Sequence, residues 1–122
     1  MVGAPAPATP QLHIHVADRF LIRARGLLWR APLPLGHFMY FPNCRSVHTF
    51  GMRYALTIIF VDRTGHTVHI DRKVVPNRIA ICWKASGVCE TTWTREEDAV
   101  DVDLNLLQSS LAQVQVRNQT PR

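Results

Sequence analysis

The sequence lacks long hydrophobic runs: its most apolar stretch, residues 56–61, covers only six residues and includes a threonine. A membrane-spanning helix needs roughly 20 apolar residues, so no segment predicts one. Residues 1–10 have neither a basic head nor an apolar core, which are the marks of a secretory signal. These absences favour a water-soluble domain located in the cytoplasm.

Patterns typical of metal sites and disulfide frameworks are also missing. The chain has three cysteines and no Cys-x-x-Cys or His-Glu-x-x-His motif, and an odd number without a signal favours reduced thiols. Four side chains are of the kinds that bind zinc: Cys44 and His48, and also His13 and His15. His13 and His15 share one face of an expected strand. Nothing in the spacing brings the four together, so we expect neither a metal nor a cofactor. The three cysteines are Cys44, Cys82 and Cys89.

Acidic residues are outnumbered, with 9 Asp and Glu against 14 Lys and Arg and a formal net charge of +5. Residues 1–84 hold 11 basic and 3 acidic side chains, whereas residues 85–122 hold 3 basic and 6 acidic ones. Twelve of the basic residues are arginines, whose planar fork suits fixed contacts with carboxylate or phosphate groups. The asymmetry indicates an anion-binding body with an acidic tail, a tail that folds back onto the body, or simply a soluble basic surface.

The length and composition predict a single folded domain. The chain has 122 residues, 47% of them hydrophobic and 19% charged, which excludes a wholly disordered protein. We expect a flexible Pro/Ala-rich lead-in over residues 1–10, one domain over residues 11–106 and a polar tail over residues 107–122. The pattern leaves open whether the last dozen residues form a frayed helix or are disordered.

Short strands dominate the predicted secondary structure. The clearest unit is a hairpin in which the β-branched and aromatic strand 56–61 returns through an Asp-Arg-Thr-Gly turn into residues 66–73. Apolar residues at helical spacing between Asp18 and Pro32 predict one helix. Further strands are expected at residues 11–16, 38–41, 79–83 and 88–93. The fold class is therefore α+β and mainly β: a compact antiparallel or mixed sheet curled toward a small barrel, with one helix from the N-terminal half packed against it.

Residues 43–53 form the densest group of chemically active side chains. Strand geometry here predicts His48, Phe50 and Met52 on one face, with Thr49 and Arg53 on the other. An arginine, a histidine and a hydroxyl beside an apolar wall are what a small anionic ligand needs. The alternative is structural, with Phe50 and Met52 in the core and the polar side chains bonded to the backbone.

This segment carries a resemblance to a known family. Residues 46–53 read Ser-Val-His-Thr-Phe-Gly-Met-Arg and lead into Tyr-Ala-Leu-Thr-Ile-Ile-Phe-Val-Asp at 54–62. Together with Arg-Ala-Arg-Gly-Leu-Leu-Trp-Arg at 23–30 and Val-Cys-Glu at 88–90, they resemble the DUF192 family of uncharacterised bacterial and archaeal proteins. The resemblance covers roughly residues 12–93 and implies a small, largely β domain without an established activity.

One departure from the family pattern concerns the candidate site. The family commonly places an acid where this chain has Thr57. If that acid serves catalysis, this chain is impaired; if it pairs with Arg53, its replacement leaves Arg53 free for a ligand.

Three functions remain as hypotheses, and the first is a non-catalytic domain that binds a small anionic ligand or a peptide at the 48–53 motif. The second is an enzyme with Cys44 as nucleophile, His48 as base and Glu90 as the acid or as the group that orients the base. The third is nucleic-acid binding through arginines and exposed aromatic residues, although no membrane span or known nucleic-acid module is present. The candidate ligand-binding residues are Arg25, Cys44, His48, Thr49, Arg53 and Glu90.

Two expectations about burial follow. Phe50 and Met52 lie between apolar strands, so we expect both to be largely buried. Glu90 stands between a cysteine and a threonine in an expected strand, where a carboxylate without a partner is costly. We therefore expect Glu90 to pair with Arg25 or Arg53.

Overall fold

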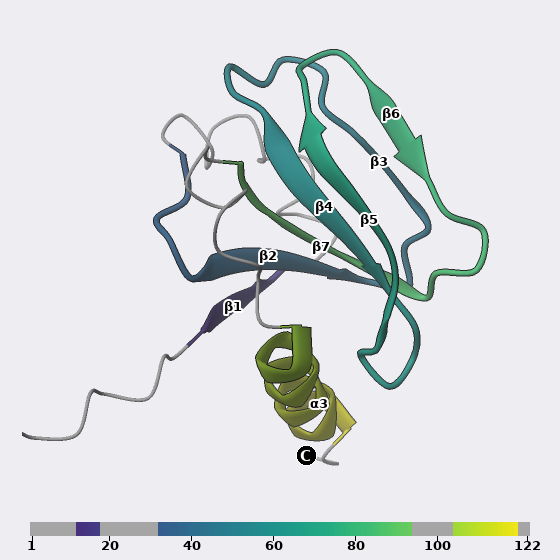
Figure 1. The fold of residues 1–122 in the computed structure, drawn as a ribbon. Helices are drawn as coiled ribbons and strands as arrows, with labels where there is room; N and C mark the ends of the chain where they lie inside the picture. The colour runs from purple at the N-terminus through teal and green to yellow at the C-terminus, as the bar shows by residue number, and fades with distance from the viewer. Residues whose placement is uncertain (1–11, 18–31, 94–103, 120–122) are drawn as a thin grey trace, which may run out of the picture.

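A computed structural model describes residues 12–17, 32–93 and 104–119 (Figure 1). Its centre is a five-stranded sheet in the order β1-β2-β7-β4-β5. β1 pairs with β2 in parallel, and the other neighbouring strands are antiparallel. The strands are β1 (His13–Val16), β2 (His37–Pro42), β4 (Leu56–Val61), β5 (Thr67–Val74) and β7 (Gly87–Thr92).

The two central strands, β4 and β7, are buried along their whole length. Burial on both faces explains why β4 is a continuous apolar run instead of an alternating one. Leu56, Ile58 and Phe60 belong to one core cluster, while Ile59 and Val61 belong to a second cluster on the opposite face. The sheet is therefore the middle layer of three.

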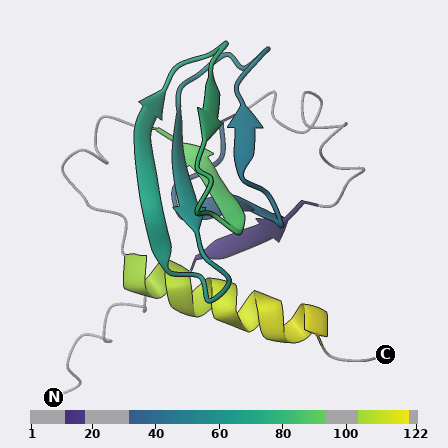
Figure 2. The ribbon, with the colours of Figure 1, turned by 90° about the vertical axis from the view of Figure 1, so that its right-hand side faces the viewer.

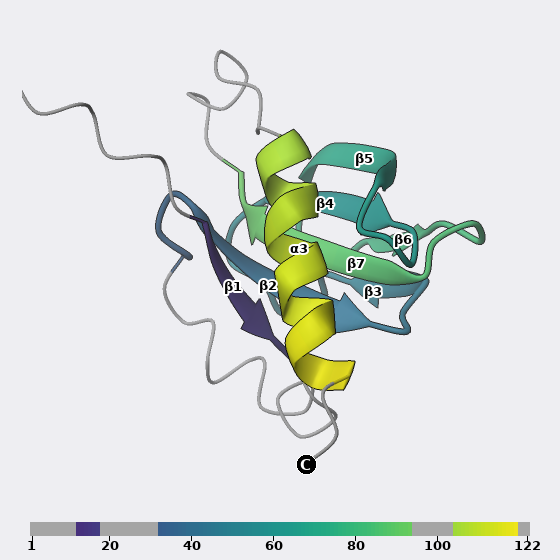
Figure 3. The same cartoon turned by 90° about the horizontal axis from the view of Figure 1, so that it is seen from below.

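A second sheet of two strands covers the first cluster. β3 (Ser46–His48) and β6 (Ile79–Ile81) are antiparallel, and their inward residues Val47 and Ala80 complete that core. This two-stranded sheet is called the outer sheet below. Figure 3 shows β3 and β6 on the side of the five-stranded sheet opposite to α3.

Helix α3 (Leu104–Gln119) covers the other face. Its residues Leu107 and Leu111 are fully buried among the second cluster, with Leu104 and Val114 packed at the margin. These four residues follow helical spacing, so one narrow stripe anchors an otherwise polar helix. Of the two alternatives left open for the end of the chain, the structure has the helix as far as Gln119.

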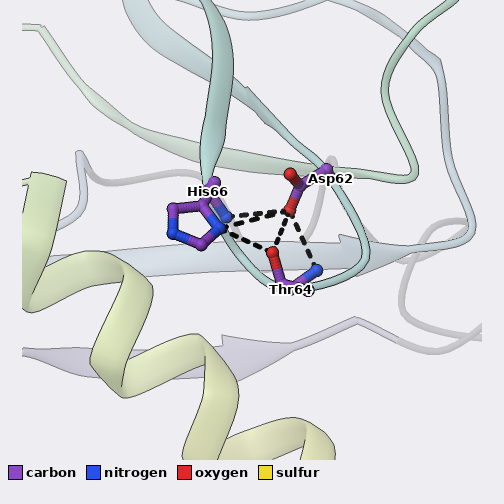
Figure 4. Close-up of polar contacts among 3 residues, drawn as sticks. All are labelled: Asp62, Thr64 and His66. Atoms are coloured by element: carbon purple, nitrogen blue, oxygen red, sulfur yellow. Dashed lines mark hydrogen bonds and ion pairs between the residues drawn. The ribbon is translucent and has the colours of Figure 1, made fainter.

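The β4–β5 turn extends toward α3 (Figure 2). Asp62 Oδ1 accepts hydrogen bonds from the Thr64 backbone N–H, the Thr64 hydroxyl and the His66 backbone N–H, at 2.9, 2.7 and 3.0 Å (Figure 4). The Thr64 hydroxyl bond, above all, lowers the pKa of Asp62. The predicted hairpin is confirmed, with β4 over the expected residues and β5 displaced by one.

The fold is α+β and mainly β, as expected, but the sheet is not closed into a barrel. β1 and β5 are its two edge strands, and no described strand joins these edges to each other. The outer sheet and α3 cover its two faces. The helix expected between Asp18 and Pro32 lies outside the described residues, so it stays a prediction. Among the described helices, none is both long and apolar enough to cross a membrane.

Candidate functional site

The outer sheet holds the central part of the 43–53 segment. The register of β3 and β6 pairs Ser46 with Ile81, Val47 with Ala80 and His48 with Ile79. Val47 points inward, so the alternation of the strand directs His48 outward and Thr49 inward. His48 and Thr49 lie on opposite faces as predicted, but Thr49 and not His48 is on the core side. Apolar residues occur at both odd and even positions of this segment, so the sequence does not show which positions face the core. In the structure Val47 faces the core, and Phe50 does not.

Phe50 is 53% exposed, so the prediction that it is largely buried is wrong. It lies in a turn beside Gly51, whose φ of 78° ends the strand alternation. Its ring stacks on the exposed ring of His48, with centroids 5.0 Å apart and planes 26° apart. Met52 is half-buried and packs against the first core cluster. An aromatic surface therefore accompanies His48 on the outside of the molecule.

Thr49 has a structural role. Its side chain is only 1% exposed, and its hydroxyl donates to the Val75 carbonyl oxygen at 2.7 Å while accepting from the Arg78 backbone N–H at 2.9 Å. The Thr49 backbone adds bonds to the Arg78 carbonyl oxygen and from the Asn77 N–H. Thr49 thus fixes the turn before β6, and its hydroxyl is already occupied by backbone groups.

Arg53 is exposed, and within the described part of the chain neither a hydrogen bond nor an ion pair holds its side chain. Arg45 and Arg78 are also exposed in the segments that form the outer sheet. No Asp or Glu occurs in residues 43–61 or 72–89. The outer sheet therefore presents cations without local carboxylates to neutralise them.

The other candidate residues lie apart from His48 and Arg53. Cys44 packs against the first core cluster, and its Sγ–H donates to the Ser46 carbonyl oxygen at 3.0 Å. Glu90 is fully buried in the middle of β7, opposite Met39 and Ile58. Cys44, His48 and Glu90 therefore occupy three different environments. Arg25 lies outside the described residues.

The predicted ion pair of Glu90 with Arg53 is not formed within the described part of the structure. A pair of Glu90 with Arg25, which lies outside the described residues, stays a prediction. On the same strand, burial and the neighbouring charge of Glu90 raise the pKa of the Cys89 thiol far above its ordinary value. Cys89 is thus a protonated core residue, in keeping with its small apolar character.

A histidine cluster joins β1 to β2, and the sequence reasoning did not include its central member. His37 stacks on His13 with ring centroids 4.3 Å apart, and its Nδ1 is 3.0 Å from Nε2 of His15. Partial burial first, and then the charges of His13 and His15, lower the pKa of His37. The parallel register of His13 with His37 follows from strand pairing, which the sequence alone does not give.

The structure places Cys44 and His48 apart from His13 and His15, the four residues that were considered as a zinc set. His13 and His15 are on β1, at the edge of the five-stranded sheet, whereas Cys44 and His48 are in and beside the outer sheet. Among the described residues, no group of three or more His, Cys, Asp or Glu side chains could hold a metal ion.

The three layers define a small α+β domain, and exposed cationic side chains lie in and beside its outer sheet. The chain belongs to the DUF192 family, described as "Uncharacterized ACR, COG1430", whose profile matches residues 4–118. No protein of curated function matches the chain significantly.

Two solved structures have the same fold. A protein of unknown function from Novosphingobium aromaticivorans DSM 12444 has a TM-score of 0.60 and 19% identity, over 75% of this chain and 70% of that one. A proposed transcription regulator from Sinorhizobium meliloti 1021 has a TM-score of 0.58 and 19% identity, over 75% and 74%. At this identity the likeness shows the fold alone.

Proposed function

We propose that this protein is a non-catalytic binding domain that takes a small anionic ligand or a peptide at the outer sheet, around His48 and Arg53. One observation carries the proposal: His48, Phe50 and Arg53 are all exposed in a segment, residues 43–61, that contains no carboxylate. A cation left without an internal partner, beside an aromatic surface, is suited to bind a carboxylate or phosphate.

The three side chains contribute different interactions. Arg53 supplies a permanent charge and a planar set of donors. His48 adds a donor that gains a positive charge on protonation, so anion affinity rises on acidification. Phe50 offers apolar surface for the rest of the ligand. A non-catalytic role is supported by the separate environments of Cys44 and Glu90, which lack the mutual contacts that a nucleophile and its acid or base need.

We also propose that this binding domain is cytoplasmic, and the three free cysteine thiols support this proposal. Nucleic acid is the second candidate ligand, since its phosphates would suit the same cations. A steep loss of oligonucleotide affinity with added salt, without any response to carboxylates, would favour nucleic acid.

A thermal-shift series with inorganic phosphate, succinate and an acidic peptide tests the proposal. A ligand at 100 times its Kd adds about 2.7 kcal/mol to stability, so binding raises Tm measurably. Arg53→Ala removes a charge-assisted hydrogen bond and should weaken binding roughly ten- to a hundredfold.

Arg63→Ala is the matched control, because Arg63 is exposed in the distant β4–β5 turn. Equal effects of the two variants, or no response to any of the three anions, would contradict the proposal.

A further inference from the structure

Strand β6 of the outer sheet presents bulky apolar side chains to solvent. Ile79 and Ile81 are 62% and 50% exposed, and Trp83, which follows the strand, is 76% exposed. Soluble proteins usually protect edge strands with charged residues or proline, because an apolar edge invites another strand. Three large apolar residues at two-residue spacing therefore indicate an interaction surface.

The backbone of β6 is open on one side. Among the described strands, each strand of the outer sheet has a hydrogen-bonded neighbour on one side only. The bonds from Thr49 N–H to the Arg78 carbonyl and from Cys82 N–H to the Arg45 carbonyl fix which pairs are hydrogen-bonded. Alternation then makes Ile79 and Ile81 members of the non-hydrogen-bonded pairs, so their N–H and C=O groups point away from β3.

On the outward edge of β3, one backbone group already has a hydrogen-bond partner. The Ser46 carbonyl oxygen accepts a hydrogen bond from the Cys44 thiol, whereas no described donor or acceptor satisfies the outward groups of Ile79 and Ile81. The open edge of β6 is therefore the better template for an added strand.

The charges beside β6 are all positive. Arg78 immediately precedes the strand, Lys84 follows Trp83, and both are exposed. Residues 72–89 contain no carboxylate. A segment lying along β6 would meet cations at both of its ends, which requires acidic residues in a complementary partner.

We propose that the open edge of β6 binds an extended acidic peptide of a partner protein, which joins the outer sheet as a third strand. The proposal rests on the proposed function and specifies its ligand class. The edge N–H and C=O groups of Ile79 and Ile81 pair with the peptide backbone, the exposed apolar residues contact its apolar side chains, and Arg78 and Lys84 contact its carboxylates. A nucleic acid or a lipid surface cannot form the backbone ladder, and branched aliphatic side chains give bases no flat surface for stacking.

The probe is a fluorescein-labelled peptide, Glu-Ile-Glu-Val-Glu-Ile-Glu, capped at its C-terminus and measured by fluorescence anisotropy. Two further peptides are N-methylated, one at every apolar residue and the other at every glutamate. In an added strand only alternate N–H groups face the neighbour. We expect one methylated peptide to lose at least about tenfold in affinity and the other to bind within about twofold of the parent, since each lost bond contributes modestly.

Protein variants locate the edge. Ile79→Thr and Ile81→Thr should weaken binding of the parent peptide several-fold, whereas Val68→Thr, on the edge strand β5, should leave it unchanged. Equal affinity of the two methylated peptides overturns strand addition. If Arg53→Ala still weakens that binding, the anion site stands while the edge proposal falls.

Three other ligands could occupy the β6 edge: a nucleic acid, a lipid surface or a second copy of the chain. Each gives a result that differs from the one expected for a peptide. Preferential binding of a single-stranded oligonucleotide or of phosphatidylserine vesicles, abolished by Ile81→Thr, assigns the surface to those ligands and overturns the proposal. Self-association in sedimentation that Ile81→Thr abolishes assigns it to a second copy of the chain, with the same consequence.

Discussion

At the scale of single residues, Thr49 connects β3 to the turn before β6 through its buried hydroxyl. Thr49→Val keeps the shape of the side chain but leaves the Val75 carbonyl and the Arg78 N–H without this partner. We expect the free energy of unfolding, measured by urea denaturation, to fall by about 1–3 kcal/mol. Thr49→Ser retains the hydroxyl and is the control. A loss in Thr49→Val no larger than in Thr49→Ser would show that these bonds contribute little.

His37 makes the stability of the fold depend on pH. Its pKa in the folded protein is lowered from the ordinary value of 6.5, so below that pH the unfolded chain binds more protons than the folded one. The contribution of His37 to the free energy of unfolding is therefore fully present above pH 6.5 and decreases as the pH falls below it.

Urea denaturation between about pH 8 and pH 5 measures the slope of stability against pH. We expect His37→Asn to have a shallower slope than the natural chain. An unchanged slope in His37→Asn would show that His37 is not responsible.

The residue pattern of the 43–53 segment shows where sequence reasoning succeeds and where it stops. The segment was recognised because it gathers a histidine, arginines and a hydroxyl between strands. Its orientation could not be read, because Val47, Phe50 and Met52 supply apolar residues of both parities. The deciding contact is the packing of Val47 beside Ala80, a residue more than thirty positions away.

At the scale of elements, the β4–β5 turn and α3 stabilise each other. A Cβ at Gly65 would lie 3.2 Å from the Gln108 carbonyl oxygen and 3.2 Å from Leu111 Cβ. Gly65 also has a φ of 87°, in the left-handed region. Gly65→Ala should therefore strain the turn by about 1–2 kcal/mol and also displace α3.

Gly51→Ala is the matched control, because Gly51 has a φ of 78° but no atom within 4 Å of the added Cβ. In both variants alanine must adopt a left-handed φ, so both are strained in the backbone. Only Gly65→Ala should also speed hydrogen exchange at the amides of Leu107 and Leu111. Identical exchange in the two variants would mean that the turn does not support the helix.

The elements themselves were predictable to different degrees. The hairpin of β4 and β5 was predicted because its strands are long and its turn residues are distinctive. Strand β3 was missed because three residues give no measurable alternation. The helix at the end of the chain was left open, because its apolar stripe consists of only a few residues among polar ones.

At the scale of the whole molecule, the three layers separate two kinds of surface. The face under α3 is closed by the helix, whereas the outer sheet has solvent on its far side, and Arg45, Arg53 and Arg78 are exposed in and beside it. Six residues were predicted from the sequence to form one site. In the structure His48 and Arg53 are exposed to solvent, whereas Thr49 and Glu90 are buried. Ile79 and Ile81 were not singled out, because exposure depends on which layer a strand occupies.

The most direct test of the account is a two-dimensional NMR titration of the ¹⁵N-labelled protein with the acidic heptapeptide, with backbone amides assigned. We predict that the largest shift changes lie in residues 46–53 and 78–84 and that Arg53→Ala raises the Kd they report roughly ten- to a hundredfold. Amides of α3 and of the β4–β5 turn should not move. Shift changes centred on α3 or on the turn around Arg63, or no saturable changes at all, would contradict the assignment of the outer sheet as the binding surface.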